Sequence, residues 1–224
     1  MKTTVVYPGT NSMIRVDLQQ GEKVKAESNA MVVMSTTIDL EGKLEGGLMA
    51  GLGRMMAGEK FFFQTLSANR GSGYALLAPS TPGDVFSIEL DGSIEYNVQK
   101  DGFLAGSDTI QVNTKMQNLS QGLLSGEGFF ILKVSGKGTL VLSSFGAIHE
   151  VNLSAGEEYT IDNAHLVAWP TTTSYRIDKA SKGWFSSFTS GEGLVCKFTG
   201  PGKVYIQTRN SAAFGSWIQQ FVRK

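Results

Sequence analysis

Short runs in which apolar and polar side chains alternate recur along most of the chain. Residues 13–18 and 85–90 are the clearest examples, and alternation with a period of two is typical of a strand with one buried face. Runs rich in β-branched residues, such as 31–34, also favour strands. The 27 glycines punctuate these runs, at positions where turns need positive φ. The pattern therefore predicts an all-β fold.

The expected strands cover the chain from residue 13 to residue 208. They span residues 13–18, 24–27, 31–34, 61–63, 74–77, 85–90, 94–98, 103–105, 109–113, 129–134, 139–143, 148–153, 159–162, 165–169, 174–177, 194–198 and 204–208. Only two stretches have a helical pattern. Phe214, Trp217, Ile218, Phe221 and Val222 recur at helical spacing and predict a short C-terminal amphipathic helix over residues 211–223. The other candidate helix is residues 45–57.

A motif of Gly-Glu, an apolar run and Gly-x-Gly occurs three times. The Gly-Glu pairs start 68 and 65 residues apart, at Gly58-Glu59, Gly126-Glu127 and Gly191-Glu192. The Gly-x-Gly turns start 65 and 64 residues apart, at Gly71, Gly136 and Gly200. Two landmarks with one period indicate an internal triplication. We expect a single domain, residues 1–224, with repeats at about 13–90, 93–153 and 155–208.

The three recurring glutamates allow two interpretations. They could form a threefold ring of carboxylates, or each could accept backbone N–H bonds where a strand begins. We favour the second, because all three repeats keep the glutamate while its neighbours diverge.

Composition narrows the function classes. Lys and Arg total 20 and Asp and Glu total 20, so a broad basic face for nucleic acid is not favoured, although a local patch stays open. The single cysteine, Cys196, excludes an intrachain disulfide and a cysteine-based metal site. Its apolar surroundings indicate a buried small hydrophobe. The N-terminus has no apolar signal region, and no stretch reaches the ~20 apolar residues of a membrane span. We therefore expect a cytoplasmic protein.

No catalytic motif survives inspection. Residues 53–60 resemble a phosphate loop, but Glu59 stands where that loop needs lysine and would repel a phosphate. His149 and His165 lack metal-ligand spacing, and no Gly-x-Ser-x-Gly elbow is present. The pair Glu157-Glu158 is typical of a solvated turn. We expect no enzyme activity, no metal and no cofactor.

The most unusual segment is an apolar loop, residues 46–58, with three of the chain's eight methionines. It could fill the core of the first repeat, or it could contact a partner, since methionine-rich surfaces adapt to varied shapes. The first interpretation is the favoured one, but only the first repeat carries the loop, so it cannot serve the internal threefold and is free to serve contacts between chains or with a partner. The residues of this candidate interaction loop are Gly47, Met49, Gly51, Arg54, Met55 and Met56.

Residues 47–63, with Arg54 ahead of Ala57-Gly58-Glu59 and a phenylalanine run, resemble the altered-inheritance-of-mitochondria family. The ending at residues 200–208 does as well. The resemblance implies three tandem β units of a short double-stranded β-helix type about a pseudo-threefold axis, like the tryptophan RNA-binding attenuation protein. It also implies assembly into a ring, commonly a trimer, and supplies no catalytic residues. Mitochondrial relatives are tied to inner-membrane organisation, whereas this chain resembles a bacterial member.

Two functions follow as hypotheses. The first is a non-enzymatic scaffold or interaction protein, related to membrane organisation and assembled as a homo-oligomer, with a trimer favoured. Its outside partner would be a protein or a membrane surface. The second is an RNA- or small-ligand-binding module in the manner of the attenuation protein. Lys137 and Lys203 lie at the Gly-x-Gly turns where basic residues would serve RNA, but the first repeat has Ser72 there. We expect no DNA binding and little or no RNA binding.

Overall fold

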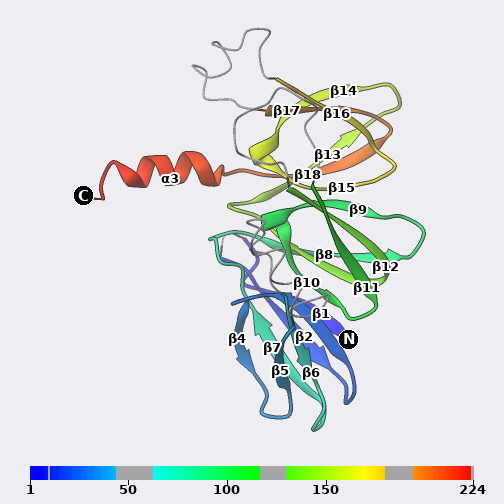
Figure 1. The fold of residues 1–224 in the computed structure, drawn as a ribbon, viewed down its shortest axis with the longest axis vertical. Helices are drawn as coiled ribbons and strands as arrows, with labels where there is room; N and C mark the ends of the chain where they lie inside the picture. The colour runs from blue at the N-terminus through cyan, green and yellow to red at the C-terminus, as the bar shows by residue number, and fades with distance from the viewer. Residues whose placement is uncertain (10, 44–62, 117–129, 180–193, 223–224) are drawn as a thin grey trace.

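Strands make up most of the described chain, and one helix follows them (Figure 1). The structure is a computed structural model that describes residues 1–9, 11–43, 63–116, 130–179 and 194–222. The β strands fall into three consecutive groups. The first strand group is β1 (Lys2–Val6), β2 (Met13–Leu18), β3 (Lys23–Glu27), β4 (Met31–Met34), β5 (Asp39–Lys43), β6 (Phe63–Ser67) and β7 (Gly73–Leu77).

The other two groups and the helix complete the described elements. The middle strand group is β8 (Val85–Asp91), β9 (Tyr96–Gln99), the short 3-10 helix η1 (Lys100–Gly102), β10 (Phe103–Ser107), β11 (Ile110–Met116) and β12 (Phe130–Ser143). The last strand group is β13 (Ile148–Leu153), β14 (Glu158–Asp162), η2 (Asn163–His165), β15 (Leu166–Pro170), β16 (Ser174–Lys179), β17 (Leu194–Thr199) and β18 (Gly202–Gln207). The helix is α3 (Ser211–Gln219).

One antiparallel pairing scheme recurs in the three strand groups. In the last group β18 lies between β13 and β15, and β17 lies between β14 and β16. In the first group β7 takes the place of β18 and β6 that of β17. In the middle group both places belong to the single long strand β12, through its second and first halves. A register shift also recurs in three corresponding strand pairs, β4 with β7, β10 with β12, and β15 with β18. It lies at Met31/Val33, Phe103/Ala105 and Leu166/Ala168.

The three Gly-x-Gly segments stand at equivalent points of this scheme. They separate β6 from β7 and β17 from β18, but Gly136-Lys137-Gly138 lies inside β12. The prediction of a turn between two strands is therefore wrong for the middle group. The backbone passes this point at φ +103° for Gly136, where a Cβ would lie 2.8 Å from the carbonyl oxygen of Thr109. Glycine is required because the strand continues through this point with a positive φ and without room for a Cβ.

Neighbouring strand groups are joined by one strand pair each, β10 with β3 and β15 with β9. Figure 1 shows that the groups follow one another in chain order along the long axis, from blue through green to yellow and orange. In both pairs a strand of one group meets a strand of the group before it, at equivalent places in the pairing scheme. A closed ring of three groups would need the equivalent third pair, β4 of the first group with β14 of the last. Among the described strands, β4 pairs with β7 alone and β14 with β17 alone. The described ladder is an open row, which differs from the pseudo-threefold arrangement that the resemblance implies.

Within the described residues the core consists of three hydrophobic clusters, each centred on one strand group. Alternation along β2 buries Ile14, Val16 and Leu18 while the residues between them stay half-buried, as the period of two predicts. Each of the first two clusters also takes residues from the group that follows it, such as Leu104 in the first and Val167 in the second. This shared burial holds neighbouring groups together in addition to the strand pairs, because burial of apolar surface stabilises the folded chain wherever that surface lies.

The sequence missed two strands, β1 and β5. Residues 39–43 read Asp-Leu-Glu-Gly-Lys and have little intrinsic strand preference. They form β5 because β6 supplies an antiparallel partner from Asp39↔Ser67 to Lys43↔Phe63. The C-terminal helix is confirmed but ends earlier, at Gln219. The other candidate helix, residues 45–57, lies outside the described residues.

Candidate functional site

Helix α3 projects from the side of the β body as an arm (Figure 1). Its start is well defined because the side chain of Asn210 accepts a hydrogen bond from the backbone N–H of Ala213 at 3.0 Å, a standard N-cap. Every residue from 211 to 222 is exposed except Gly215, which is half-buried. Projection of a helix in this way leaves both of its faces in contact with water.

The segment before the arm is fixed to the body by hydrogen bonds. The backbone N–H of Arg209 donates to the carbonyl of Phe145 at 3.1 Å, and the hydroxyl of Thr208 accepts from the N–H of Ala147 at 2.9 Å. The side chain of Gln207 bonds to Phe145 N–H at 2.9 Å and to the carbonyl of Ala164 at 3.0 Å. The arm therefore starts from a rigid base.

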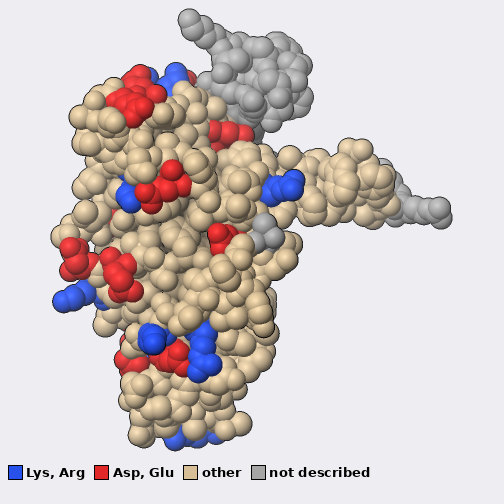
Figure 2. Space-filling view, turned by 180° about the vertical axis from the view of Figure 1, so that it is seen from behind, with Lys and Arg blue, Asp and Glu red and all other residues tan. Residues whose placement is uncertain are grey.

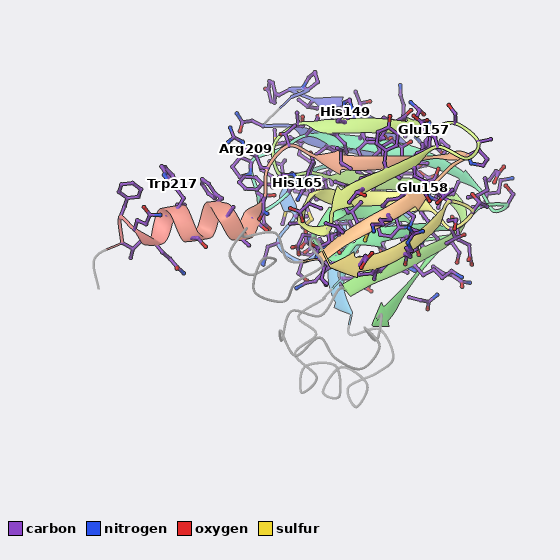
Figure 3. All side chains as sticks on the ribbon, turned by 90° about the horizontal axis from the view of Figure 1, so that it is seen from above. His149, Glu157, Glu158, His165, Arg209 and Trp217 are labelled. Carbon is purple, nitrogen blue, oxygen red and sulfur yellow. The ribbon has the colours of Figure 1, made fainter. Side chains whose placement is uncertain are left out.

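The apolar face that the sequence predicts for this helix faces solvent. Its exposed fractions are 55% for Trp217 and 68% for Phe221, and the other members are also exposed: Phe214, Ile218 and Val222. Figure 3 shows Trp217 on the arm, away from the β body. Large apolar side chains grouped on a surface mark an interaction site more often than scattered ones do.

Four aromatic rings form a continuous aromatic row from the body to the tip of the arm. The row consists of Phe145, Phe214, Trp217 and Phe221, with successive ring centroids 5.2, 5.9 and 5.2 Å apart. Such separations are favourable for aromatic pairs. The row makes one connected apolar surface rather than isolated side chains.

The described part of the arm carries no charged side chain, although Arg223 and Lys224 follow it in the sequence. Residues 211–222 include no Lys, Arg, Asp or Glu, and Figure 2 shows the arm as uncharged surface beyond the basic residue at its base, in contrast to the mixed charges of the body. Figure 3 labels Arg209 at that base, near His165. The Nδ1 of His165 lies 2.7 Å from the carbonyl oxygen of Gln207, so this histidine supports the base of the arm.

The residues that the sequence analysis singled out meet different outcomes. The candidate loop and the Gly-Glu pairs lie outside the described residues: Gly47, Met49, Gly51, Arg54, Met55, Met56, Gly58, Glu59, Gly126, Glu127, Gly191 and Glu192. The structure places His149 at an exposed position of β13. Within the described ranges no three His, Cys, Asp or Glu side chains gather as a metal would require.

Cys196 is confirmed as a buried hydrophobe. It is fully buried in the third hydrophobic cluster, and burial, with a smaller contribution from Asp162, raises the pKa of its thiol to about 12. Glu157 is a turn residue as expected, because its carboxylate accepts from the N–H of Ser154 at 2.8 Å. This bond lowers the pKa of Glu157. The turn prediction is wrong for Glu158, which is the first residue of β14 and lies 3.8 Å from Arg176 in a surface ion pair.

Comparison with known proteins identifies the family. The family model described as Mitochondrial biogenesis AIM24 matches residues 3–209. The chain belongs to this AIM24 family. The resemblance to the altered-inheritance-of-mitochondria proteins is thereby confirmed.

Relatives of the AIM24 chain occur in bacteria and fungi. An uncharacterized protein of Streptococcus pyogenes serotype M6 is 33% identical over 217 residues, which cover 94% of this chain and 86% of that protein. The mitochondrial altered inheritance of mitochondria protein 24 of Verticillium alfalfae is 29% identical over 161 residues, 70% of this chain but 41% of the fungal protein. A crystal structure of a Streptococcus pyogenes protein superposes with a TM-score of 0.84 at 33% identity, over 99% of both chains.

The AIM24 match is consistent with the observed fold, and the description of the family names no catalytic activity. Among the described residues no helix combines the length and apolarity needed to cross a bilayer. The sequence predicted the amphipathic helix but not the direction of its apolar face. The available signal was the polar side of the helix, which consists of serine, alanine and glutamine instead of the charged residues usual on a solvent-facing helix.

Proposed function

We propose that this AIM24 protein is a non-enzymatic scaffold or interaction protein that assembles by packing its α3 arm against a second copy of the chain. The observation that carries the proposal is the solvent-facing aromatic row of the arm. Burial of side chains of this size is worth roughly 1.5–3 kcal/mol each. Their exposure in one chain is a strong drive toward association.

The chemistry of the arm favours an apolar protein surface over a lipid headgroup layer. Helices that lie on membranes usually carry Lys and Arg on the polar face, which attract anionic lipid. Residues 211–222 carry none. A membrane role would therefore belong to the assembled protein and not to the arm by itself.

A second copy offers a suitable acceptor at the edge of its first strand group. Strand β4 is an edge strand, paired with β7 on one side only within the described sheets. Val32 and Val33 on it are 51% and 42% exposed. Unpaired edges with apolar side chains tend to be covered in a stable assembly. Arm-to-edge packing is head-to-tail, which gives a ring when the rotation between copies closes, and we favour a closed trimer.

The recurrence of one pairing scheme supports a further part of the proposal. Three strand groups with the same pairings and the same register shift are what three copies of one ancestral unit would leave. In this view the middle copy has merged two strands into β12. The expected likeness to the tryptophan RNA-binding attenuation protein belongs to the same hypothesis.

Light scattering coupled to size exclusion at micromolar concentration tests the assembly. We expect a wild-type mass near three times the 24.1 kDa of the chain, and a mass near one chain for Trp217→Ser combined with Phe221→Ser. Both side chains are exposed, so the double variant should fold. The matched control is Tyr159→Ser, which removes an aromatic side chain 42% exposed on β14.

Two results would overturn the proposal: a monomeric wild type, or a double variant with the wild-type mass. Separate variants Met49→Lys, Met55→Lys and Met56→Lys test whether the candidate interaction loop lies in the contact. Loss of assembly in these variants, but not in the arm variant, would assign the interface to the loop instead.

A further inference from the structure

The two strand pairs that join neighbouring groups have the same register. The recurring register shift makes Ala105 of β10 and Ala168 of β15 corresponding residues. Ala105 lies opposite Ala26 of β3. Ala168 lies opposite Val98 of β9. Ala26 and Val98 correspond as well, since each stands seven residues before the residue that ends the shift in its own group. One rule therefore sets both junctions.

The same rule defines a third junction that the described part of the chain does not contain. The corresponding residues are Val33 in β4 and Ile161 in β14, which stands seven residues before Ala168. Among the described strands β4 and β14 have one partner each, and Figure 1 places them in the groups at opposite ends of the row. A second copy of the chain can supply the missing strand to each of these edges.

Burial differs between the unpaired strand β4 and its paired counterparts. Val32 and Val33 of β4 are 51% and 42% exposed, whereas the corresponding residues of β10 and β15 are fully buried: Leu104, Ala105, Val167 and Ala168. The buried residues lie in the hydrophobic cluster of the group before, which is the first cluster for β10 and the second for β15. No group precedes β4 in its own chain, so its two valines lack the cluster that covers their counterparts.

We propose that β4 of one chain pairs antiparallel with β14 of a second copy, so that Val32 and Val33 pack on the third hydrophobic cluster of that copy. The cluster reaches β14 through Ile161. An edge strand that gains a partner satisfies its main-chain hydrogen bonds and buries apolar side chains together. The proposal rests on the head-to-tail assembly proposed above and names the strands that meet in it. By the rule of the two internal junctions, the register is Val33↔Ile161, Met34↔Thr160 and Ser35↔Tyr159.

The same copy brings its arm to this edge. Asn163, which follows β14, and Ser211, which begins α3, line one pocket of about 440 Å³. The arm therefore starts beside the end of β14. In the proposed register Met31 and Val32 lie at that end, so β14 pairs with the backbone of β4 while the arm covers the start of the strand.

Disulfide cross-linking between two co-expressed variants tests the pair. Met34→Cys places a thiol at a half-buried position, and Thr160→Cys places one at an exposed position, so both variants should fold. Opposite residues of an antiparallel pair have Cβ atoms about 4.5–5.5 Å apart, close to the distance that a disulfide needs. We expect a covalent dimer on a non-reducing gel after mild oxidation. Neither variant alone should form it, nor should the wild type, whose Cys196 is buried.

Glu158→Cys is the matched control for the register. Glu158 is exposed on β14 two residues from Thr160, which makes it a diagonal neighbour of residue 34 at about 7–8 Å, beyond the usual reach of a disulfide. We expect Met34→Cys to cross-link with Thr160→Cys about 10-fold faster than with Glu158→Cys, because of this difference in distance. Equal rates with the two partners would overturn the proposed register.

The same experiment in chains that also carry Trp217→Ser and Phe221→Ser separates the strand pair from the arm. A covalent dimer that persists there would support the strand pair and overturn the arm as the interface, whereas its loss there would support both. A wild-type trimer whose cysteine variants do not cross-link would overturn the strand pair alone, and a monomeric wild type would overturn both proposals. Tyr159→Ser, the control for the arm, should leave the pair in place, because main-chain bonds supply the affinity of an added strand.

Discussion

Phe145 and Phe214 meet edge to face, with ring centroids 5.2 Å apart and ring planes at 67°. Phe145 is buried at the end of the middle strand group, whereas Phe214 is 42% exposed on the first turn of α3. This is the point where the aromatic row passes from the body to the arm. The contact fixes the direction of a helix that otherwise projects into solvent.

Phe214→Ala should loosen the arm without affecting the body. The variant removes the ring contact with Phe145, and edge-to-face pairs are worth about 0.5–1.5 kcal/mol. We expect faster amide hydrogen exchange across residues 211–219 and an unchanged melting temperature for the β body. Gln219→Ala, which removes a polar side chain from the same helix, is the control. Exchange in the helix equal to that of the wild type would show that the contact does not hold the arm.

Two glycine substitutions should have opposite effects. At Gly215 an added Cβ meets nothing within 4 Å, so Gly215→Ala should stabilise α3 by about 0.5–1 kcal/mol through helix propensity. At Gly83 the Cβ would lie 1.5 Å from the carbonyl oxygen of Ser144, across the bridge between Gly83 and Gly146. Gly83→Ala should therefore destabilise the protein by roughly 1–3 kcal/mol or more.

Circular dichroism and chemical denaturation would measure this pair. A Gly83→Ala variant as stable as the wild type would mean that the connection between β7 and β8 can move away from Ser144. A Gly215→Ala variant with lower helical content would mean that the arm needs the glycine for its contacts.

Glu27 should make the protein less stable as pH rises from about 4.5 to about 7. Its pKa is raised in the folded protein, so the unfolded chain releases this proton first and is stabilised relative to the folded chain over that interval. Glu27→Gln removes the effect. We expect the variant to match the wild type in melting temperature at pH 4 and to exceed it at pH 8.

Glu157→Gln supplies a control of opposite sign. The N–H of Ser154 lowers the pKa of Glu157, so its carboxylate stabilises the fold above the unfolded pKa, and the variant should melt lower at pH 8. A Glu27→Gln variant that melts below the wild type at pH 8 would contradict the assignment of Glu27 as a desolvated carboxyl.

The strands were predictable from sequence because their information is local. The alternation at Ile14, Val16 and Leu18 sets both the strand and its buried face, and it was read correctly. Strand β5 was not predictable, because its pairing with β6 comes from residues far along the chain. The continuity of β12 was not predictable either. Gly136 has a positive φ, and a glycine with positive φ can end a strand in a turn or stand inside a continuous strand.

The two candidate interaction surfaces depend even more on tertiary arrangement. Periodicity identified the apolar face of α3, but a helical pattern is the same whether that face packs on a body or faces solvent. The free edges of β4 and β14 follow from the pairings of the described strands. No motif in the sequence marks either strand as an edge, and only the row of groups shows that Val33 and Ile161 stand at its two ends.

RNA should bind weakly or not at all. Affinity for RNA depends largely on basic side chains that neutralise phosphates, and such binding falls steeply with salt. Here the nitrogen of Lys203 lies 3.0 Å from the carboxylate of Glu150, and that of Lys197 lies 2.8 Å from Asp178. Lys133 pairs with Glu95 in the same way. A phosphate would have to displace a carboxylate at each of these positions.

Filter binding with a mixed-sequence single-stranded RNA at 100 mM salt would test this expectation. We expect no saturation below about 10 µM protein, since few phosphates could be neutralised. Glu150→Gln frees Lys203 from its acidic neighbour, so any residual binding should strengthen in this variant and should weaken in Lys203→Gln. A submicromolar, salt-sensitive dissociation constant for the wild type would contradict the prediction. It would also mean that basic residues beyond these ion pairs form the RNA surface that the family resemblance suggests.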